Sequence, residues 1–201
     1  MISTKLTSLA VAGAACFAAT TAMAQIPYPN PGTIIANSDA QILTANGGDI
    51  TVTYDHGITS GDHDVLYLNG TELFDNQSST VGQQIDLGIF SAGTVMDFTM
   101  TDYGNGGSVT GTHTWEMGSG VNNSDGNVHA YVTSNGVDGN NKPVTFVGWE
   151  DETTGQLYSD WNYNDLTFDF ANASPSSVPE PGTMALVGLG VGSLLIFRRR
   201  K

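Results

Sequence analysis

Three features of the sequence predict an all-β fold, an antiparallel β-sandwich or jelly roll of roughly ten strands. Apolar and polar residues alternate over short segments, which is the period of a strand with one buried face. Asn-Gly and Asp-Gly pairs, which are typical of tight turns, separate these segments. Between the two apolar ends of the chain, no segment shows a sustained helical period.

The clearest alternation covers four segments, at residues 50–54, 96–101, 128–133 and 166–170. Asn69-Gly70 predicts a two-residue hairpin turn between strands over 64–68 and 71–74. Further strands are expected over 33–36, 83–90, 108–117 and 143–149. The β domain is therefore expected to span residues 33–170.

The segments on either side of this domain have the composition of extended chain. Residues 25–32 contain three prolines and are expected to form an extended lead-in. Residues 171–177 contain three serines and Pro175, a composition typical of a linker.

The N-terminal end, residues 1–24, has the features of a cleavable signal peptide with a helical apolar region. Lys5 supplies the positive charge, residues 6–19 are apolar, and Ala22 and Ala24 form the small-x-small cleavage box. Cleavage by signal peptidase is expected to leave Gln25 as the first residue.

The C-terminal end, residues 178–201, carries a second apolar segment. Val178, Pro179, Glu180 and Pro181 precede a 14-residue apolar run over 184–197, and the last four residues are basic. As a helix this run would measure about 21 Å, at about 1.5 Å per residue. The hydrocarbon core of a bilayer is about 30 Å thick, so the run is short for a lasting membrane span. The basic residues favour a cytoplasmic C-terminus.

This order of Pro-Glu-Pro, apolar helix and Arg-rich terminus closely resembles the PEP-CTERM sorting signal. The resemblance implies that an exosortase recognises the tail, cuts near Pro179 to Pro181 and passes the protein to the surface of a Gram-negative bacterium. It also implies an inner-membrane intermediate and a destination at the cell surface or in the extracellular biofilm matrix. A plain tail anchor is the alternative, but it leaves the Pro-Glu-Pro sequence unexplained.

Between residues 25 and 178 the chain holds 19 acidic residues and one base, Lys142, which gives a formal charge of about −18. Nucleic-acid binding and docking on anionic lipid need clustered bases, so this region predicts neither, and membrane contact is expected only through the terminal segments. Self-repulsion that aids solubility and partial neutralisation by divalent cations both remain open. The single Cys16 lies in the signal region, so the exported domain is expected to lack disulfides and thiolate metal ligands.

Oxygen-bearing side chains are dense between residues 150 and 165, and calcium binds six to eight oxygen ligands. The candidate ligands are Glu150, Asp151, Asp160, Asn162, Asn164 and Asp165. Asp160, Asn162 and Asn164 occupy alternate positions, so they are expected to share one face of an extended segment. The alternative is that these residues form a capped hairpin and a solvated face.

The same stretch resembles a bacterial surface domain of unknown function. Its pattern is Gly-aromatic-Glu-Asp, a short loop, and then Asp-x-Asp-Tyr-Asn-Asp-hydrophobic-x-Phe, which matches residues 148–168 except that Asn162 replaces an Asp. Members often occur in calcium-rich adhesins. An EF-hand is excluded, because Asp165 stands where its loop needs Gly. The pair of acidic residues around His63, at positions 62 and 64, is expected to be exposed and polar rather than to bind a transition metal.

These observations predict an exported cell-surface or matrix protein, with a β domain that is stabilised by calcium and performs no catalysis. One alternative is a carbohydrate-binding module for exopolysaccharide, in which exposed aromatic side chains stack on sugars. A second is a secreted polysaccharide hydrolase that uses Glu116 as one of its two acids.

Overall fold

The computed structural model describes residues 32–57, 62–104, 111–138, 142–154 and 159–178. In this part the chain forms twelve strands and two 3-10 helices, η1 Asn37–Asp39 and η2 Gly120–Asn122. The strands are β1 Gln41–Ala45, β2 Gly48–Gly57, β3 Asp64–Leu68, β4 Thr71–Asp75, β5 Gln84–Phe90, β6 Val95–Met96, β7 Phe98–Asp102, β8 His113–Glu116, β9 Ala130–Val137, β10 Pro143–Trp149, β11 Leu166–Ala171 and β12 Ala173–Ser177.

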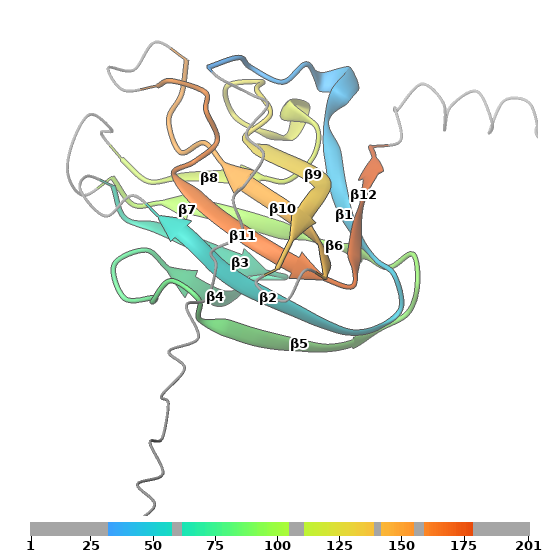
Figure 1. Cartoon of the computed structure of the whole chain (residues 1–201). Coiled ribbons are helices and arrows are strands. Elements are labelled where there is room, and N and C mark those ends of the chain that lie inside the picture. The colour runs from blue at the N-terminus through green and yellow to red at the C-terminus, as the bar shows by residue number, and fades with distance from the viewer. Residues whose placement is uncertain (1–31, 58–61, 105–110, 139–141, 155–158, 179–201) are drawn as a thin grey trace, which may run out of the picture.

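The strands form three antiparallel sheets, whose orders are β5-β2-β11-β10-β9, β4-β3-β7-β8 and β12-β1-β6. The five-stranded and four-stranded sheets lie face to face (Figure 1). Apolar side chains at alternate positions of both sheets fill the space between them, as in a β-sandwich. The predicted all-β antiparallel class is confirmed, and a sandwich fits the arrangement.

Aromatic rings join the two sheets across this core. Phe98 of β7 meets Phe170 of β11 edge to face, with ring centroids 5.0 Å apart. Phe74 of β4 lies 5.3 Å from Phe168 of β11. All four side chains are at most 1% exposed, so their burial helps to hold the sheets together.

The predicted hairpin is present between β3 and β4. Asn69 and Gly70 both have positive φ, 50° and 76°, as a type I′ turn requires. The predicted strand over 33–36 is wrong, since these residues join no sheet. Instead, the Ile35 main-chain N–H donates to the Tyr163 hydroxyl at 3.1 Å.

The predicted linker over 171–177 is also wrong, because Ala173–Ser177 is strand β12 and the β domain extends past residue 170. β12 pairs with β1, with Pro175 opposite Leu43. The missing N–H of a proline is tolerated there because β12 is an edge strand. Serine and proline suggested a linker, and pairing with β1, a strand not predicted, overrides that composition.

Several predicted features lie outside the described residues: the signal peptide with Ala22 and Ala24, residues 25–31 of the lead-in, sorting residues Pro179, Glu180 and Pro181, and the apolar run 184–197. In the described ranges, no helix has both the length and the hydropathy to span a membrane.

Candidate metal centre

One end of the sandwich collects acidic residues because strands of both sheets begin or end there. β3 begins at Asp64 and β7 ends at Asp102, which lie directly opposite each other in the register of these strands. β10 ends one residue before Glu150, and its partner β11 begins one residue after Asp165. The four acidic residues thus come from two facing sheets.

Three of the six predicted ligands come together at this end. Glu150, Asp151 and Asp165 each place a carboxylate oxygen within 4.8 Å of the other two. Glu150 and Asp151 are 1% and 8% exposed. One Asp165 oxygen, Oδ2, also accepts a hydrogen bond from the Asp151 main-chain N–H at 3.2 Å. The trio therefore has the spacing of a metal site and a main-chain bond that fixes its shape.

Two stacked rings hold the main chain of residues 150 and 151 in place. Trp115 and His129 lie parallel, with centroids 3.8 Å apart. The Trp115 indole N–H donates to the Asp151 carbonyl at 2.8 Å, and Nδ1 of His129 lies 2.8 Å from the Glu150 carbonyl. Because both rings are fully buried, the strand end that presents the carboxylates is rigidly supported.

Close packing explains why the first residue of the acidic motif, Gly148, is a glycine. A Cβ on Gly148 would overlap the main-chain oxygen of Tyr163. The Tyr163 hydroxyl donates to the Val128 carbonyl at 2.9 Å, so the segment is pinned to the core. Only glycine lets β10 and the segment before β11 approach this closely.

The expected extended face with Asp160, Asn162 and Asn164 is wrong. Trp161 and Tyr163 have positive φ, 54° and 56°, so the segment winds through turns and the alternate positions do not share one face. Asp160 Oδ1 accepts from the Asn162 N–H at 3.1 Å, and Asn162 Oδ1 accepts from the Asn164 N–H at 2.9 Å.

Asp160 and Asn162 use their oxygens inside these turns, whereas Asn164 does not. Both carboxylate oxygens of Asp160 accept hydrogen bonds from Asn162. The charge of Asp160 still contributes to raising the pKa of Glu150. Asn164 Oδ1 is buried and has no hydrogen-bond partner among the described residues. Asn164 thus stays a candidate ligand, and Asp160 lies at the margin of the cluster.

The structure adds acidic residues that sequence reasoning missed: Asp62, Asp64, Asp102 and Glu152. Asp64, Asp102 and Glu152 are 1%, 0% and 3% exposed, so the expectation that Asp64 is an exposed polar residue is wrong. Asp64 and Asp102 lie far from the motif in sequence, and only the pairing of β3 with β7 brings them together.

Several carboxyl groups at this end have raised pKa values. Burial, and then the neighbouring acids, raise the pKa of Glu150 to about 8 and that of Asp151 to about 9. The pKa of Asp102 rises to about 6, chiefly through burial. The same causes place the pKa values of Asp64 and Asp165 well above the usual carboxyl range. Every shift has the sign expected for negative charges removed from water and placed together.

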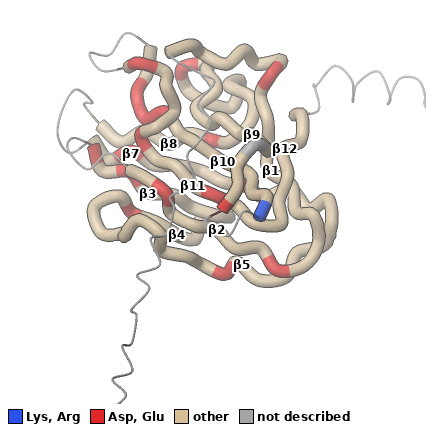
Figure 2. Tube along the Cα trace, viewed as in Figure 1, with Lys and Arg blue, Asp and Glu red and all other residues tan. Residues whose placement is uncertain are grey.

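No base compensates these charges in the described ranges, where Lys142 is the only Lys or Arg. Lys142 lies just before β10 begins, at the opposite end of that strand from Glu150. Figure 2 shows the described chain rich in red acidic segments and poor in blue basic ones. A buried cluster of this charge needs protons or a cation.

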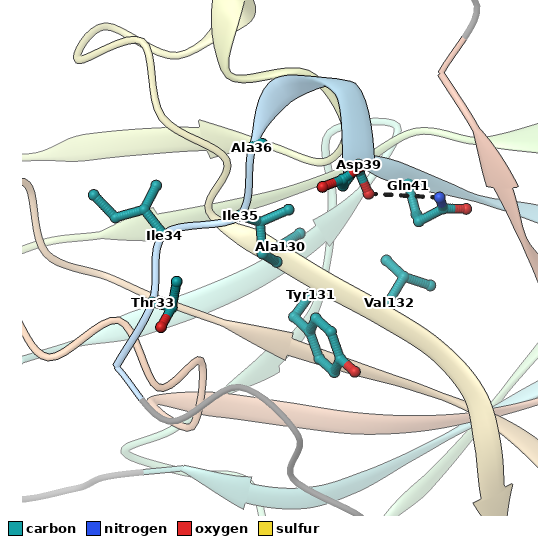
Figure 3. A pocket seen from close by; sticks show the side chains of 9 residues that line it. All are labelled: Thr33, Ile34, Ile35, Ala36, Asp39, Gln41, Ala130, Tyr131 and Val132. Atoms are coloured by element: carbon teal, nitrogen blue, oxygen red, sulfur yellow. Dashed lines mark hydrogen bonds between the residues drawn. The ribbon is translucent and has the colours of Figure 1, made fainter.

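A separate cavity of about 340 Å³ lies between β9 and the segment that leads into η1 (Figure 3). Its lining is largely apolar and includes Ile35, Ala130 and Val132, with Tyr131 on one side. Asp39 is its one acidic residue. Tyr131 is the aromatic side chain here that could stack on a sugar, because Trp115, Trp149 and Trp161 are buried.

The metal-free protein is expected to lose stability as pH rises. Carboxyl groups in the unfolded chain have pKa values of roughly 4. In the folded protein, Glu150 and Asp151 have pKa values of about 8 and about 9. Between these values the folded state binds more protons, so the free energy of unfolding falls as pH rises, by up to about 1.4 kcal/mol per pH unit for each such group.

Urea titrations of protein stripped of metal, at pH 5 to 9 in metal-free buffer, measure this slope. Glu150→Gln is expected to flatten it, while Glu72→Gln, at an exposed acid on β4, leaves it unchanged. A stability that is flat or rises over this range contradicts the raised pKa values.

Residues 177–201 match the family model of the PEP-CTERM protein-sorting motif. The match contains all four predicted sorting residues, Val178 to Pro181, and begins at Ser177, the last residue of β12. Comparison with curated proteins and with solved structures gave no match. The motif indicates export to the cell surface by way of an exosortase. The chain therefore carries a PEP-CTERM protein-sorting motif over residues 177–201.

Proposed function

We propose that this exported protein is a non-catalytic component of the cell surface or extracellular matrix, with a β domain stabilised by calcium. The observation that carries the proposal is the trio of Glu150, Asp151 and Asp165, whose carboxylate oxygens lie within 4.8 Å of one another. Glu150 and Asp151 are buried and Asp165 is half-buried, without a Lys or Arg nearby among the described residues. A divalent cation supplies the positive charge that no neighbouring Lys or Arg among the described residues provides.

The donor set favours calcium over other metals. All the candidate ligands offer oxygen, which suits hard cations, and the exported domain has no Cys. The nearest buried imidazole, His129, directs Nδ1 at the Glu150 carbonyl and Nε2 at Asp125, so its nitrogens have other partners. Extracellular calcium modules bind with dissociation constants of roughly 10⁻⁴ to 10⁻³ M. Modest affinity is thus enough outside the cell.

Burial of the acidic cluster also argues against catalysis there. Glu150 and Asp64 are each 1% exposed, so a polymer substrate cannot reach their carboxyl groups. Glu116, the acid of the hydrolase alternative, is exposed on β8, and its own main-chain N–H is bonded to Asn123. A glycosidase requires two carboxyl groups that face one bond, so the burial of these acids supports a non-catalytic role.

Calcium is expected to raise the melting temperature of the protein above its value in EDTA. At a calcium concentration 100 times the dissociation constant, the gain is about 2.7 kcal/mol. Glu150→Gln removes one ligand, so it is expected to gain less from calcium than wild type does.

Scanning calorimetry at pH 7.5 in each condition measures both effects, with Glu72→Gln as the matched control. Glu72 is exposed on β4, so its variant is expected to follow wild type in both conditions. Equal wild-type midpoints in calcium and EDTA would rule the stabilising ion out.

The sorting tail is expected to be removed during transfer to the surface. Intact mass of protein extracted from the cell surface is expected to match a chain that begins at Gln25 and ends near Pro179. A surface product that retains Arg198 would show that the tail acts as an anchor and is not processed.

A second candidate, binding of exopolysaccharide, is favoured by the cavity beside Tyr131. Its few polar groups and one aromatic ring resemble the lining of small-molecule sites. Binding of exopolysaccharide fragments that is lost on Tyr131→Ala, with calcium-dependent melting unchanged, would support this candidate. Binding that survives the substitution would place the sugar elsewhere.

A further inference from the structure

The acids of the four-stranded sheet form a second group beside the trio. Asp64 of β3 and Asp102 of β7 are direct cross-strand partners, 1% and 0% exposed. Like charges at such positions repel and destabilise a sheet. His113, opposite Asp102 on β8, acts to lower the pKa of Asp102, and its ring stacks over Trp115.

Each of these two carboxylates has one anchored oxygen and one bare oxygen. Asp64 Oδ2 accepts from the Asn76 side-chain amide at 3.1 Å, and Asp102 Oδ1 accepts from the Gly104 N–H at 2.7 Å. Among the described residues, Asp64 Oδ1 and Asp102 Oδ2 are buried without a hydrogen-bond partner. The same holds for Oδ1 of Asp62. Metal-binding carboxylates often have one oxygen held by a hydrogen bond and the other free to coordinate the ion, which is the arrangement found here.

Asn76 shows that the orientation of Asp64 is built into the fold. Asn76 is 2% exposed and its side chain bonds Asp64 twice, since Oδ1 accepts from the Asp64 N–H and Nδ2 donates to Asp64 Oδ2. Its Nδ2 also donates to the Asp62 carbonyl at 3.0 Å. One side chain therefore fixes both acids at the start of β3.

Asp151 interacts electrostatically with both groups. Its charge contributes to raising the pKa of Asp64, and the charges of Asp102 and Asp62 contribute to raising the pKa of Asp151. It also belongs to the trio with Glu150 and Asp165. A carboxylate in this position has two oxygens with which to bridge two ions.

One divalent cation would neutralise only a small part of the charge in this cluster. Asp62, Asp64, Asp102, Glu150, Asp151, Glu152 and Asp165 carry seven negative charges when ionised. One calcium ion would leave a charge of about −5, and two would leave about −3.

We propose that a second calcium ion binds to Asp62, Asp64 and Asp102, shares Asp151 with the ion of the trio, and so joins the two sheets through a binuclear centre. This inference rests on the proposed calcium site and extends it across the sandwich. Asp64 and Asp102 belong to the four-stranded sheet, whereas Asp151 and Asp165 flank strands of the five-stranded sheet. The two ions thus link the two sheets, as a disulfide does in other exported proteins.

The test is the number of calcium ions bound by the full chain, purified in detergent and stripped with EDTA. Equilibrium dialysis with radioactive calcium is expected to give two ions per chain for wild type and for Glu72→Gln. Asp102→Asn keeps the shape of the side chain and the bond to Gly104, so it is expected to bind one ion. It is also expected to melt higher than wild type in EDTA, because it relieves repulsion from Asp64.

The outcomes separate the two proposals. Wild type that binds one ion, with Asp102→Asn also binding one, overturns the second site and leaves the first intact. Wild type that binds none overturns both, and shows that shared protons neutralise the cluster. Asp62→Asn, at a less buried position, repeats the test if Asp102→Asn loses the near-ultraviolet signal of the packed tryptophans. Two ions bound to Asp62→Asn would contradict the proposal.

Discussion

The structure depends on how one end of the β-sandwich accommodates carboxylates that point inward from both sheets. Elsewhere the sheets are joined by aromatic and aliphatic side chains, such as Phe98 against Phe170. At this end Asp64, Asp102 and Glu150 are as deeply buried as those rings. Apolar residues of similar volume would normally be the more stable choice. Their replacement by acids has a physical reason if a cation from the surroundings completes the core.

The rest of the local structure serves that arrangement. The stacked rings of Trp115 and His129 fix the carbonyls of residues 150 and 151, so the attached carboxylates have little freedom to separate. Asn76 does the same for Asp64. Rigid supports prevent the carboxylates from relaxing apart, so their mutual repulsion destabilises the fold unless protons or a cation offset it. The sorting motif begins at the last residue of β12, so the exported domain and its sorting tail meet at an edge strand.

Alternation and turn pairs predicted most of the fold, because they are local signals. The hairpin at Asn69 and Gly70 follows from the positive φ that such a pair accepts. β12 was missed because its stability comes from pairing with β1, which composition does not show. The sequence identified Glu150, Asp151 and Asp165 because they are close along the chain. It could not reveal Asp64 and Asp102, which strand register brings to the site, and positive φ at Trp161 and Tyr163 overturned the alternate-position argument.

A crystal structure of the exported domain grown with calcium tests the central claim most directly, through anomalous density at the acidic end. The account predicts ions between the two sheets, with oxygen ligands from Asp64, Asp151 and Asp165 at about 2.3–2.6 Å. Density without an ion, with the carboxyl groups of Asp64 and Asp151 sharing a short hydrogen bond, would contradict it.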